Sequence, residues 1–190
     1  MRIIGGRARG LHLTPVGDGD AFAHLRPTSD RVREAIFNLL INGKVAQQGD
    51  PVTGARVLDL FAGTGALGLE ALSRGAAEVT FVDDGKVARA LIKRNIDLMR
   101  AGDEAVYLAA NATGLPPNRG AGFDLVFLDP PYGKGLGEAA LASCATGNWL
   151  APGALVVWEE SKAPIVPTAF SQIDQRKYGG TIVTLIRAPL

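Results

Sequence analysis

Residues 57–65 read VLDLFAGTG and residues 125–132 read LVFLDPPY, and these two stretches decide the fold. The first is typical of a buried strand that runs into a glycine-rich loop. The second is typical of a buried strand that ends in a turn stiffened by two prolines. Ligands of open α/β sheets bind at the carboxyl ends of the parallel strands. We therefore expect the two loops to lie at one edge of one sheet and to form a single site.

Strand-like and helix-like segments alternate from residue 56 onward. The strand-like runs are 56–61, 78–83, 105–109, 123–128 and 154–158, and the helix-like stretches are about 65–74, 85–101 and 136–147. Short apolar runs separated by helices are typical of parallel strands joined by crossovers. Two further strand candidates, 169–175 and 181–187, are joined by a link too short for a helix. The sequence thus predicts an α/β, Rossmann-like fold with a mostly parallel seven-stranded sheet and an antiparallel C-terminal hairpin.

The segment before this alternating region has a different pattern. Ile3-Ile4 and Leu11–Leu13 could pair as a hairpin, and a helix follows that Thr28 or Ser29 can cap. The apolar stripe of this helix consists of Val32, Ala35, Ile36, Leu39 and Leu40. Residues 42–55 are rich in Gly, Gln, Asp and Pro and are interpreted as a linker. We accordingly divide the chain into an N-terminal extension, residues 1–45, and a main domain, residues 46–190.

Composition sets further limits on the class of protein. With 190 residues and a net charge of +1, the chain supports one good hydrophobic core, and its bulk charge makes no case for nucleic-acid binding. The single cysteine, Cys144, excludes a disulfide within the chain and fits a cytoplasmic protein. No apolar run approaches the length of a membrane span, and His12 and His24 lack metal-ligand spacing. We therefore expect no membrane contact, no metal and, since no long apolar stripe is left over, a monomer.

The glycine loop carries the first chemical signal. Gly63, Gly65 and Gly68 also satisfy the G-x-G-x-x-G pattern of dinucleotide sites, so an NAD-binding site has to be weighed. Asp59, however, lies inside the strand before the loop, where a dinucleotide-binding strand is usually apolar. A carboxylate at that point suits a cationic group, such as the ammonium of S-adenosylmethionine.

Two later loops complete the predicted cofactor site. Asp83 and Asp84 follow the second strand, where a carboxylate can accept both hydroxyls of a ribose. This feature is common to NAD and S-adenosylmethionine, so it does not separate them. Of the two residues we favour Asp83, because it lies at the end of the strand. Asn111-Ala112 follows the third strand, where the edge of an adenine would lie.

The DPPY turn carries the second signal. Its two prolines remove two N–H donors, so the turn mainly presents acceptors, namely the Asp129 carboxylate and the Pro130 carbonyl. An aromatic amino group offers two donors and little else, and two fixed acceptors can orient it. Tyr132 can stack on the base that carries this group. The chemistry predicted from both loops is in-line transfer of a methyl group to an exocyclic nitrogen, in which the protein mainly supplies alignment.

Several segments of the chain resemble the bacterial 16S ribosomal RNA guanine-N2 methyltransferases. These segments are RIIGG from Arg2, LRPTSDRVREAIFN from Leu25, DLFAGTGALGLEALSRGA from Asp59, and DPPY from Asp129. The similarity extends through Tyr178-Gly179, and the stretch RPTSDRVREAIFN is its most specific part. The resemblance implies an S-adenosylmethionine-dependent fold and activity. It also implies that the substrate is 16S rRNA, within the assembled or assembling small ribosomal subunit.

The resemblance also implies roles for individual residues. Contacts with the cofactor are expected from Asp59, Phe61, Ala62, Gly63, Gly65, Asp83, Asp84, Asn111, Ala112 and Asp129. Contacts with the base and the transferred methyl group are expected from Asp129, Pro130, Pro131 and Tyr132. Contacts with rRNA are expected from Arg7, Arg26, Thr28, Arg31 and Arg33. Arginine can bind phosphate with two hydrogen bonds and can stack on bases, which suits the last group.

Two other functions stay open at the level of sequence. DPPY does not distinguish guanine N2 from the N6 of adenine in DNA or from a glutamine amide of a protein, because each presents an amino group. The glycine pattern alone also fits an NAD-binding oxidoreductase or a noncatalytic nucleotide-binding module.

Overall fold

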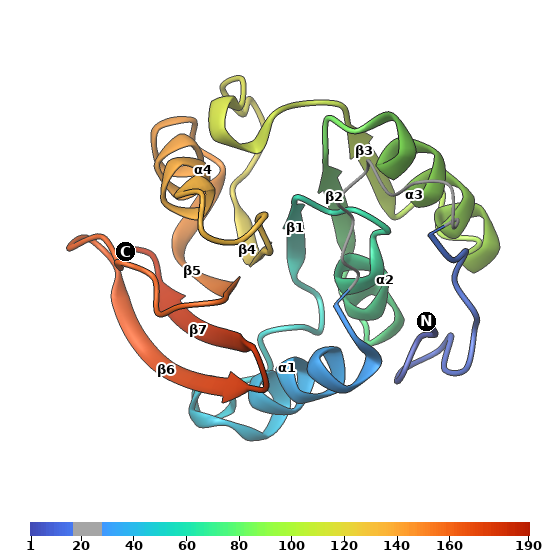
Figure 1. Cartoon of the computed structure of the whole chain (residues 1–190), viewed down its shortest axis with the longest axis horizontal. Helices are drawn as coiled ribbons and strands as arrows, with labels where there is room; N and C mark the ends of the chain where they lie inside the picture. The colour runs from blue at the N-terminus through green and yellow to red at the C-terminus, as the bar shows by residue number, and fades with distance from the viewer. Residues whose placement is uncertain (17–27) are drawn as a thin grey trace.

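The computed structural model describes residues 1–16 and 28–190, and within them seven strands form one sheet (Figure 1). The spatial order of the strands is β3-β2-β1-β4-β5-β7-β6. The strands are β1 (Arg56–Leu60), β2 (Glu78–Val82), β3 (Ala105–Leu108), β4 (Phe123–Leu128), β5 (Leu150–Glu160), β6 (Ser171–Tyr178) and β7 (Thr181–Arg187). The first five pair in parallel, and β7 pairs antiparallel with both β5 and β6. The predicted fold class is confirmed, including the antiparallel hairpin.

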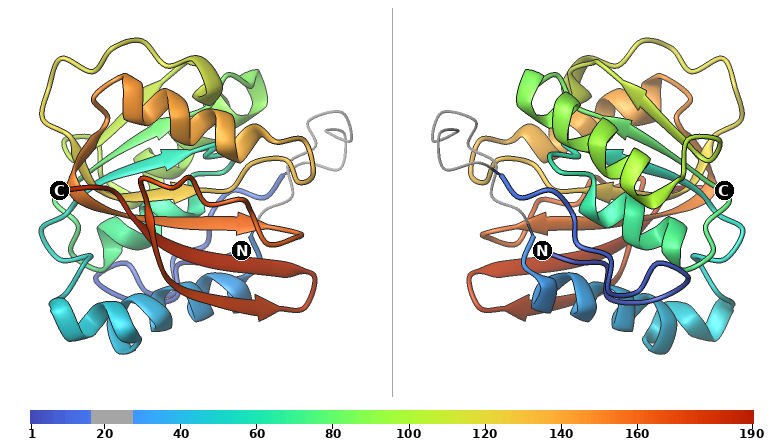
Figure 2. Two further views of the ribbon diagram at one scale, coloured as in Figure 1. Left: turned by 90° about the vertical axis from the view of Figure 1, so that its left-hand side faces the viewer. Right: turned by 90° about the vertical axis from the view of Figure 1, so that its right-hand side faces the viewer.

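Helices cover both faces of the sheet (Figure 2). They are α1 (Asp30–Asn42), α2 (Ala66–Ser73), α3 (Lys86–Met99) and α4 (Leu136–Thr146), with short 3₁₀ helices η1 (Lys44–Gln48) and η2 (Ala112–Gly114). Helices α1, α2 and α3 pack in one buried cluster with Ile3 and Leu13 of the N-terminal segment, whereas α4 packs in a second cluster on the opposite face. Of the described helices, none is long and apolar enough to cross a membrane.

Two local features differ from the sequence prediction, and both have a packing reason. Strand β5 begins at Leu150 rather than near residue 154, because a register shift against β4 accommodates Pro152 and Gly153 within the strand. The segment interpreted as a linker contains η1, because its Val45 is buried against the core. Contacts of Gln48 with Arg187 and of Lys44 with Asp174 also hold this segment, although its composition resembles that of a loop.

The N-terminal segment forms the predicted pairing in a minimal form. An antiparallel bridge joins Arg2 to His12, and the Ile3 N–H donates to the Leu11 carbonyl over 2.9 Å. After the undescribed residues 17–27, Ser29 caps α1 by accepting a hydrogen bond from the Val32 N–H over 3.3 Å. The structure therefore confirms both the short hairpin and the capped helix that the sequence predicts.

A buried ionic cluster ties the N-terminal segment to the sheet domain. The Glu70 carboxylate, on α2, accepts hydrogen bonds from the Ile4 and Gly5 N–H groups, each over 2.8 Å, and from Arg74 Nε over 2.7 Å. Arg33 Nε, on α1, lies 3.7 Å from the second oxygen of the same carboxylate. Arg33 and Glu70 are both fully buried. One carboxylate thus connects three segments that are distant in the sequence.

Arg33 requires a correction to the sequence prediction, which placed it among the residues that contact RNA. Its side chain lies in the interior, where it also pairs with Asp30 over 2.9 Å and donates to the Thr28 carbonyl over 3.3 Å. Arg33 lies on the same face of α1 as Ile36, Phe37 and Leu40, at positions i+3, i+4 and i+7, and this face is the buried one. The inward face is rotated from the predicted stripe because Glu70 compensates the buried guanidinium.

Replacing Arg33 should therefore weaken the fold. We expect Arg33→Met to lower the free energy of unfolding by about 3–5 kcal/mol, because the change breaks a fully buried ion pair with Glu70 and also removes the contacts of Arg33 with Asp30 and the Thr28 carbonyl. The matched control is Arg31→Met, in the same helix but exposed, which should change stability by less than about 0.5 kcal/mol. Denaturant unfolding of both variants measures the difference. Equal stability of the two variants would show that the ionic cluster does not hold the N-terminal segment in place.

Candidate active site

The candidate site lies at the edge where the parallel strands end. Because β1, β2, β4 and β5 run in parallel, their carboxyl ends meet at this edge. Leu60 of β1 lies opposite Leu128 of β4, so the glycine loop and the DPPY turn leave the sheet side by side. The two motifs that decide the fold are therefore brought together, as the sequence predicts.

The glycine loop has the backbone that its sequence requires. Gly63 and Gly65 have φ angles of 56° and 76°, in the left-handed region that favours glycine. Phe61 shares this region with a φ of 57°, which is uncommon for a bulky residue and typical of a functional loop. Asp59 Oδ2 accepts the Gly68 N–H over 2.9 Å. A Cβ atom at Gly68 would lie 2.4 Å from the Phe81 ring, so the helix can approach the strand this closely only with glycine there.

Asp83 connects the first two loops. Its carboxylate accepts the Gly63 N–H over 3.0 Å and the Gly85 N–H over 2.8 Å, and its carbonyl accepts the Tyr107 hydroxyl over 2.6 Å. Asp84, by contrast, points into solvent as an exposed residue. Asp83 is therefore the one of the two carboxylates that is held against the glycine loop.

The loop after β3 is ordered by its own asparagine. Asn111 Oδ1 accepts hydrogen bonds from the Thr113 N–H over 2.9 Å and from the Thr113 hydroxyl over 2.7 Å, which caps η2. Asn111 itself is exposed, whereas Ala112 is buried in the α4-side cluster. The asparagine thus shapes the loop, and its role toward a ligand stays a prediction.

The DPPY turn is held by contacts with two other parts of the chain. Asp129 Oδ2 accepts a hydrogen bond from the Thr28 hydroxyl over 2.9 Å. The Tyr132 hydroxyl lies 3.3 Å from Thr181 Oγ1, at the start of β7. Pro130 is buried and Pro131 is exposed. The turn is therefore fixed between the residue before the α1 cap and the C-terminal hairpin.

Carboxylates crowd this edge of the sheet. Burial raises the pKa of Asp129 to about 6, and burial together with Asp129 and Asp83 raises the pKa of Asp59 well above its ordinary value. Burial also raises the pKa of Asp83. In the part of the chain that the structure describes, no group of three or more His, Cys, Asp or Glu is arranged to hold a metal ion. Each raised pKa shows that a carboxyl group at this edge is short of positive charge, and a cation bound there would stabilise its ionised form, so the donor set fits a cofactor with an ammonium and a sulfonium group.

Sequence reasoning missed two acidic residues of this edge, Glu159 and Glu160. Both are buried at the end of β5. Glu159 Oε1 lies 3.4 Å from the Thr28 hydroxyl oxygen, and the Glu160 carboxylate accepts the Ser161 N–H over 2.8 Å. The available signal was the run VVWEE, in which two charges follow a buried parallel strand at the carboxyl edge.

The residues expected to contact RNA are dispersed. Arg7 is exposed and pairs with Glu104 through a hydrogen bond of 2.9 Å, and Arg31 is exposed on α1. Thr28 turns toward Asp129, and Arg33 is buried. Arg26 lies outside the described residues.

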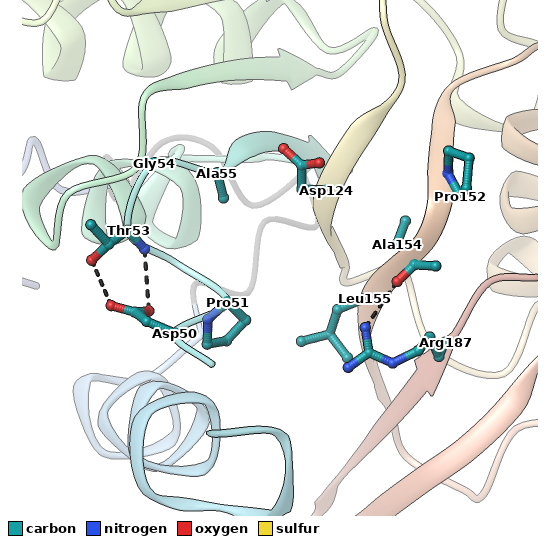
Figure 3. Close-up of a pocket in the computed structure, with 11 residues that line it drawn as sticks. Asp50, Pro51, Thr53, Gly54, Ala55, Asp124, Pro152, Ala154, Leu155 and Arg187 are labelled. Atoms are coloured by element: carbon teal, nitrogen blue, oxygen red, sulfur yellow. Dashed lines mark hydrogen bonds between the residues drawn. The ribbon is translucent and has the colours of Figure 1, made fainter. Parts of the chain in front are cut away.

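A hollow also lies at the opposite, amino edge of the sheet (Figure 3). Its lining includes Asp50, Thr53, Asp124 and Arg187, and Arg187 is engaged in a hydrogen bond of 2.9 Å to the Gly153 carbonyl. None of the predicted site residues lines this hollow, so the candidate site is the carboxyl edge alone.

The fold and the arrangement of its carboxyl edge define the class of Rossmann-like, S-adenosylmethionine-dependent methyltransferases. A solved N-methyltransferase from Bradyrhizobium japonicum, in complex with S-adenosyl-L-homocysteine, shares the fold with a TM-score of 0.64 over 92% of this chain and 94% of that one. At 12% identity this likeness concerns the fold alone. A putative methyltransferase from Escherichia coli is much more similar, with a TM-score of 0.81, 35% identity, and coverage of 100% and 98% of the two chains.

The chain belongs to the family described as "Conserved hypothetical protein 95", whose profile matches residues 1–187. It is 40% identical to the Ribosomal RNA small subunit methyltransferase D of Escherichia coli over 96% of this chain and 86% of that protein. The protein of the same name from Haemophilus influenzae is 36% identical over 94% of this chain and 89% of its own length. The family assignment from sequence is therefore confirmed, and the protein is a methyltransferase.

Proposed function

We propose that this protein transfers a methyl group from S-adenosylmethionine to the exocyclic N2 of a guanine in 16S rRNA of the small ribosomal subunit. The observation that carries the proposal is the register of β1 against β4, which sets the glycine loop beside the DPPY turn. The names of the relatives support the substrate class. The carboxyl groups at the edge support a cationic cofactor. An NAD-binding oxidoreductase would not need this group of carboxyls.

The cofactor side of the site is assigned to the first three loops. When bound, S-adenosylmethionine supplies a methyl group on a cationic sulfur. Asp83 has both carboxylate oxygens fixed by backbone N–H groups, and their remaining lone pairs can accept ribose hydroxyls. Asp59 places a buried carboxyl group under the loop, opposite the cationic part of the cofactor, and a cation bound there would stabilise its ionised form. Phe61, Ala62, Gly63 and Gly65 bring backbone close to the ligand, with Asp84, Asn111 and Ala112 at the margin.

The base side is assigned to the DPPY turn. Asp129 and the Pro130 carbonyl accept the two N–H donors of the guanine amino group, and Tyr132 stacks on the base. Transfer forms a bond between nitrogen and the methyl carbon while the bond between sulfur and that carbon breaks. The nitrogen then gives up one proton, which Asp129 accepts and passes to solvent. The acceptors orient the nitrogen lone pair, so the protein mainly supplies alignment.

The extension formed by residues 1–45 is the proposed RNA-contacting part of the chain, which acts as a monomer on the subunit. Arg7 and Arg31 are exposed on it and can reach phosphates. Arg33 is withdrawn from this set, because its side chain is buried. A guanine that is paired in the RNA has to be extruded before its amino group can reach Asp129.

The proposal is tested by methylation of small subunits that lack the modification. We expect labelled methyl groups to enter 16S rRNA and to be recovered as N2-methylguanosine after digestion. Duplex DNA with adenine targets and a glutamine-containing protein serve as competing substrates in parallel reactions. Incorporation into DNA or protein alone, or recovery of another methylated nucleoside, would replace the guanine-N2 assignment.

The acid side of the pH profile should report Asp129. Its raised pKa, about 6, means that the carboxylate is ionised above this pH and becomes protonated as the pH falls through it. Activity should therefore be about half-maximal near pH 6, approach its full value as the pH rises above it, and be lost as the pH falls below it. We expect Asp129→Ala to lower kcat by about 10²-fold or more with nearly unchanged cofactor affinity. Asp129→Asn keeps an acceptor oxygen, so this variant should retain weak activity, but its pH profile should lack the acid limb. If the acid limb is unchanged in Asp129→Asn, the titrating group is a residue other than Asp129.

The RNA contact is tested with salt titrations of binding. Arg31→Ala should weaken affinity for the RNA and reduce the slope of log K against log salt by about 0.7, the value for one phosphate of a single strand. Arg119→Ala is the matched control, since Arg119 is also exposed but lies in the loop before β4, at the amino edge. An identical salt response of both variants and the unmodified protein would remove Arg31 from the interface.

A further inference from the structure

The Thr28 hydroxyl lies between two carboxyl groups that end neighbouring strands. Its oxygen is 2.9 Å from Asp129 Oδ2 and 3.4 Å from Glu159 Oε1. Leu128 of β4 lies opposite Trp158 of β5, so the next residues, Asp129 just after β4 and Glu159 near the end of β5, lie side by side. Thr28 comes from a different part of the chain, immediately before the residue that caps α1. Three segments therefore meet at one hydroxyl group.

The chemistry of a hydroxyl limits how this contact can work. A hydroxyl has one proton to donate and can accept two hydrogen bonds. Because its contact with Asp129 is the shorter one, the hydroxyl donates its hydrogen bond to Asp129. Glu159 can then form a hydrogen bond with the hydroxyl oxygen only if its own carboxyl group is protonated and acts as the donor. Two ionised carboxylates would repel each other here, and a single proton on Glu159 removes that repulsion.

The surroundings favour this placement of the proton. Glu159 is only 2% exposed, whereas Asp129 is partly open to solvent. Burial, followed by the charge of Asp129, raises the pKa of Glu159 well above its ordinary value.

The other ionisable groups around the pair leave this balance in place. The acidic groups are Asp59 from β1 and Glu160 from β5, and both disfavour a second negative charge. Tyr132, from the DPPY turn, stays neutral because burial raises its pKa to about 12. Arg33 from α1 lowers the pKa of Glu159, but by less than burial and Asp129 raise it, and its guanidinium is engaged with Asp30 and Glu70.

We propose that Glu159 and Thr28 are positioning residues for methyl transfer: the protonated Glu159 donates to the Thr28 hydroxyl, and Thr28 donates to the ionised Asp129. These two hydrogen bonds hold the Asp129 carboxylate in one orientation and leave its second oxygen for the substrate amino group. This inference rests on the proposed function, because it assigns Asp129 as the acceptor of that group. It also gives Thr28 a task inside the site rather than a contact with RNA.

The first test needs no substrate. In protein labelled with ¹³C at the glutamate carboxyls, Glu159→Gln identifies the Glu159 signal. We expect this signal to have the chemical shift of a neutral acid at pH 7. A signal that titrates in the ordinary range of glutamate would overturn the proposal, whatever the protein methylates.

The second test follows kcat and its pH profile. Thr28→Val keeps the shape of the side chain but loses the hydroxyl, so kcat should fall about tenfold or more and the acid limb should move up by about one pH unit, because Asp129 loses a hydrogen bond to its charged form. Thr28→Ser keeps the hydroxyl and should recover most of the activity. A Thr28→Val profile with an unmoved limb would contradict the proposal.

Glu159 is tested in the same way with two substitutions. Glu159→Ala should lower kcat about tenfold, whereas Glu159→Gln, whose amide can donate to the Thr28 oxygen, should recover most of this loss. The acid limb of Glu159→Gln should stay in place, since a neutral group replaces a neutral group. A limb that moves to lower pH would show that Glu159 is ionised in the unmodified protein. If the unmodified protein itself methylates no rRNA, the proposed function fails, and the carboxyl titration still decides the protonation of Glu159.

Discussion

The structure depends on the convergence of parallel strands at one edge. Each of β1, β2, β4 and β5 ends in or beside a carboxylate, and the sheet brings these groups together where their charges repel. A fold held only by its core would gain nothing from this arrangement. The repulsion is reduced by backbone N–H donors, as at Asp59 and Asp83, by a hydroxyl at Asp129, and by burial that favours the protonated form. The edge is thus ready for a ligand that carries positive charge and N–H donors.

The buried cluster around Glu70 connects the N-terminal extension to this edge. Glu70 lies on α2, the helix that follows the glycine loop, and it fixes the N-terminal backbone at Ile4 and Gly5 and faces Arg33. Arg33 in turn holds the Thr28 carbonyl, while the Thr28 hydroxyl contacts Asp129. One line of contacts therefore runs from the helix after the glycine loop through the extension to the DPPY turn. The proposed RNA-contacting segment and the site of chemistry are parts of one packed unit.

Much of this arrangement could be predicted from sequence, because it depends on local signals. The glycine spacing and the aspartates after short apolar runs predict the strands and the edge, and they place Asp59, Asp83 and Asp129 at that edge. Arg33 was misplaced because an arginine is usually exposed, and only a partner far away in the sequence, Glu70, makes its burial favourable. Glu159 was missed because its role depends on its neighbours in space, β4 and Thr28, which are distant from it in the sequence.

A crystal structure of the protein with S-adenosylhomocysteine would show whether the glycine loop and the DPPY turn form one site. We expect that the ribose hydroxyls contact Asp83, that the amino group of the ligand lies on the Asp59 side of the glycine loop, and that its sulfur faces the turn that begins with Asp129. Electron density for the ligand in the hollow at the amino edge, or with its sulfur directed away from that turn, would contradict this expectation.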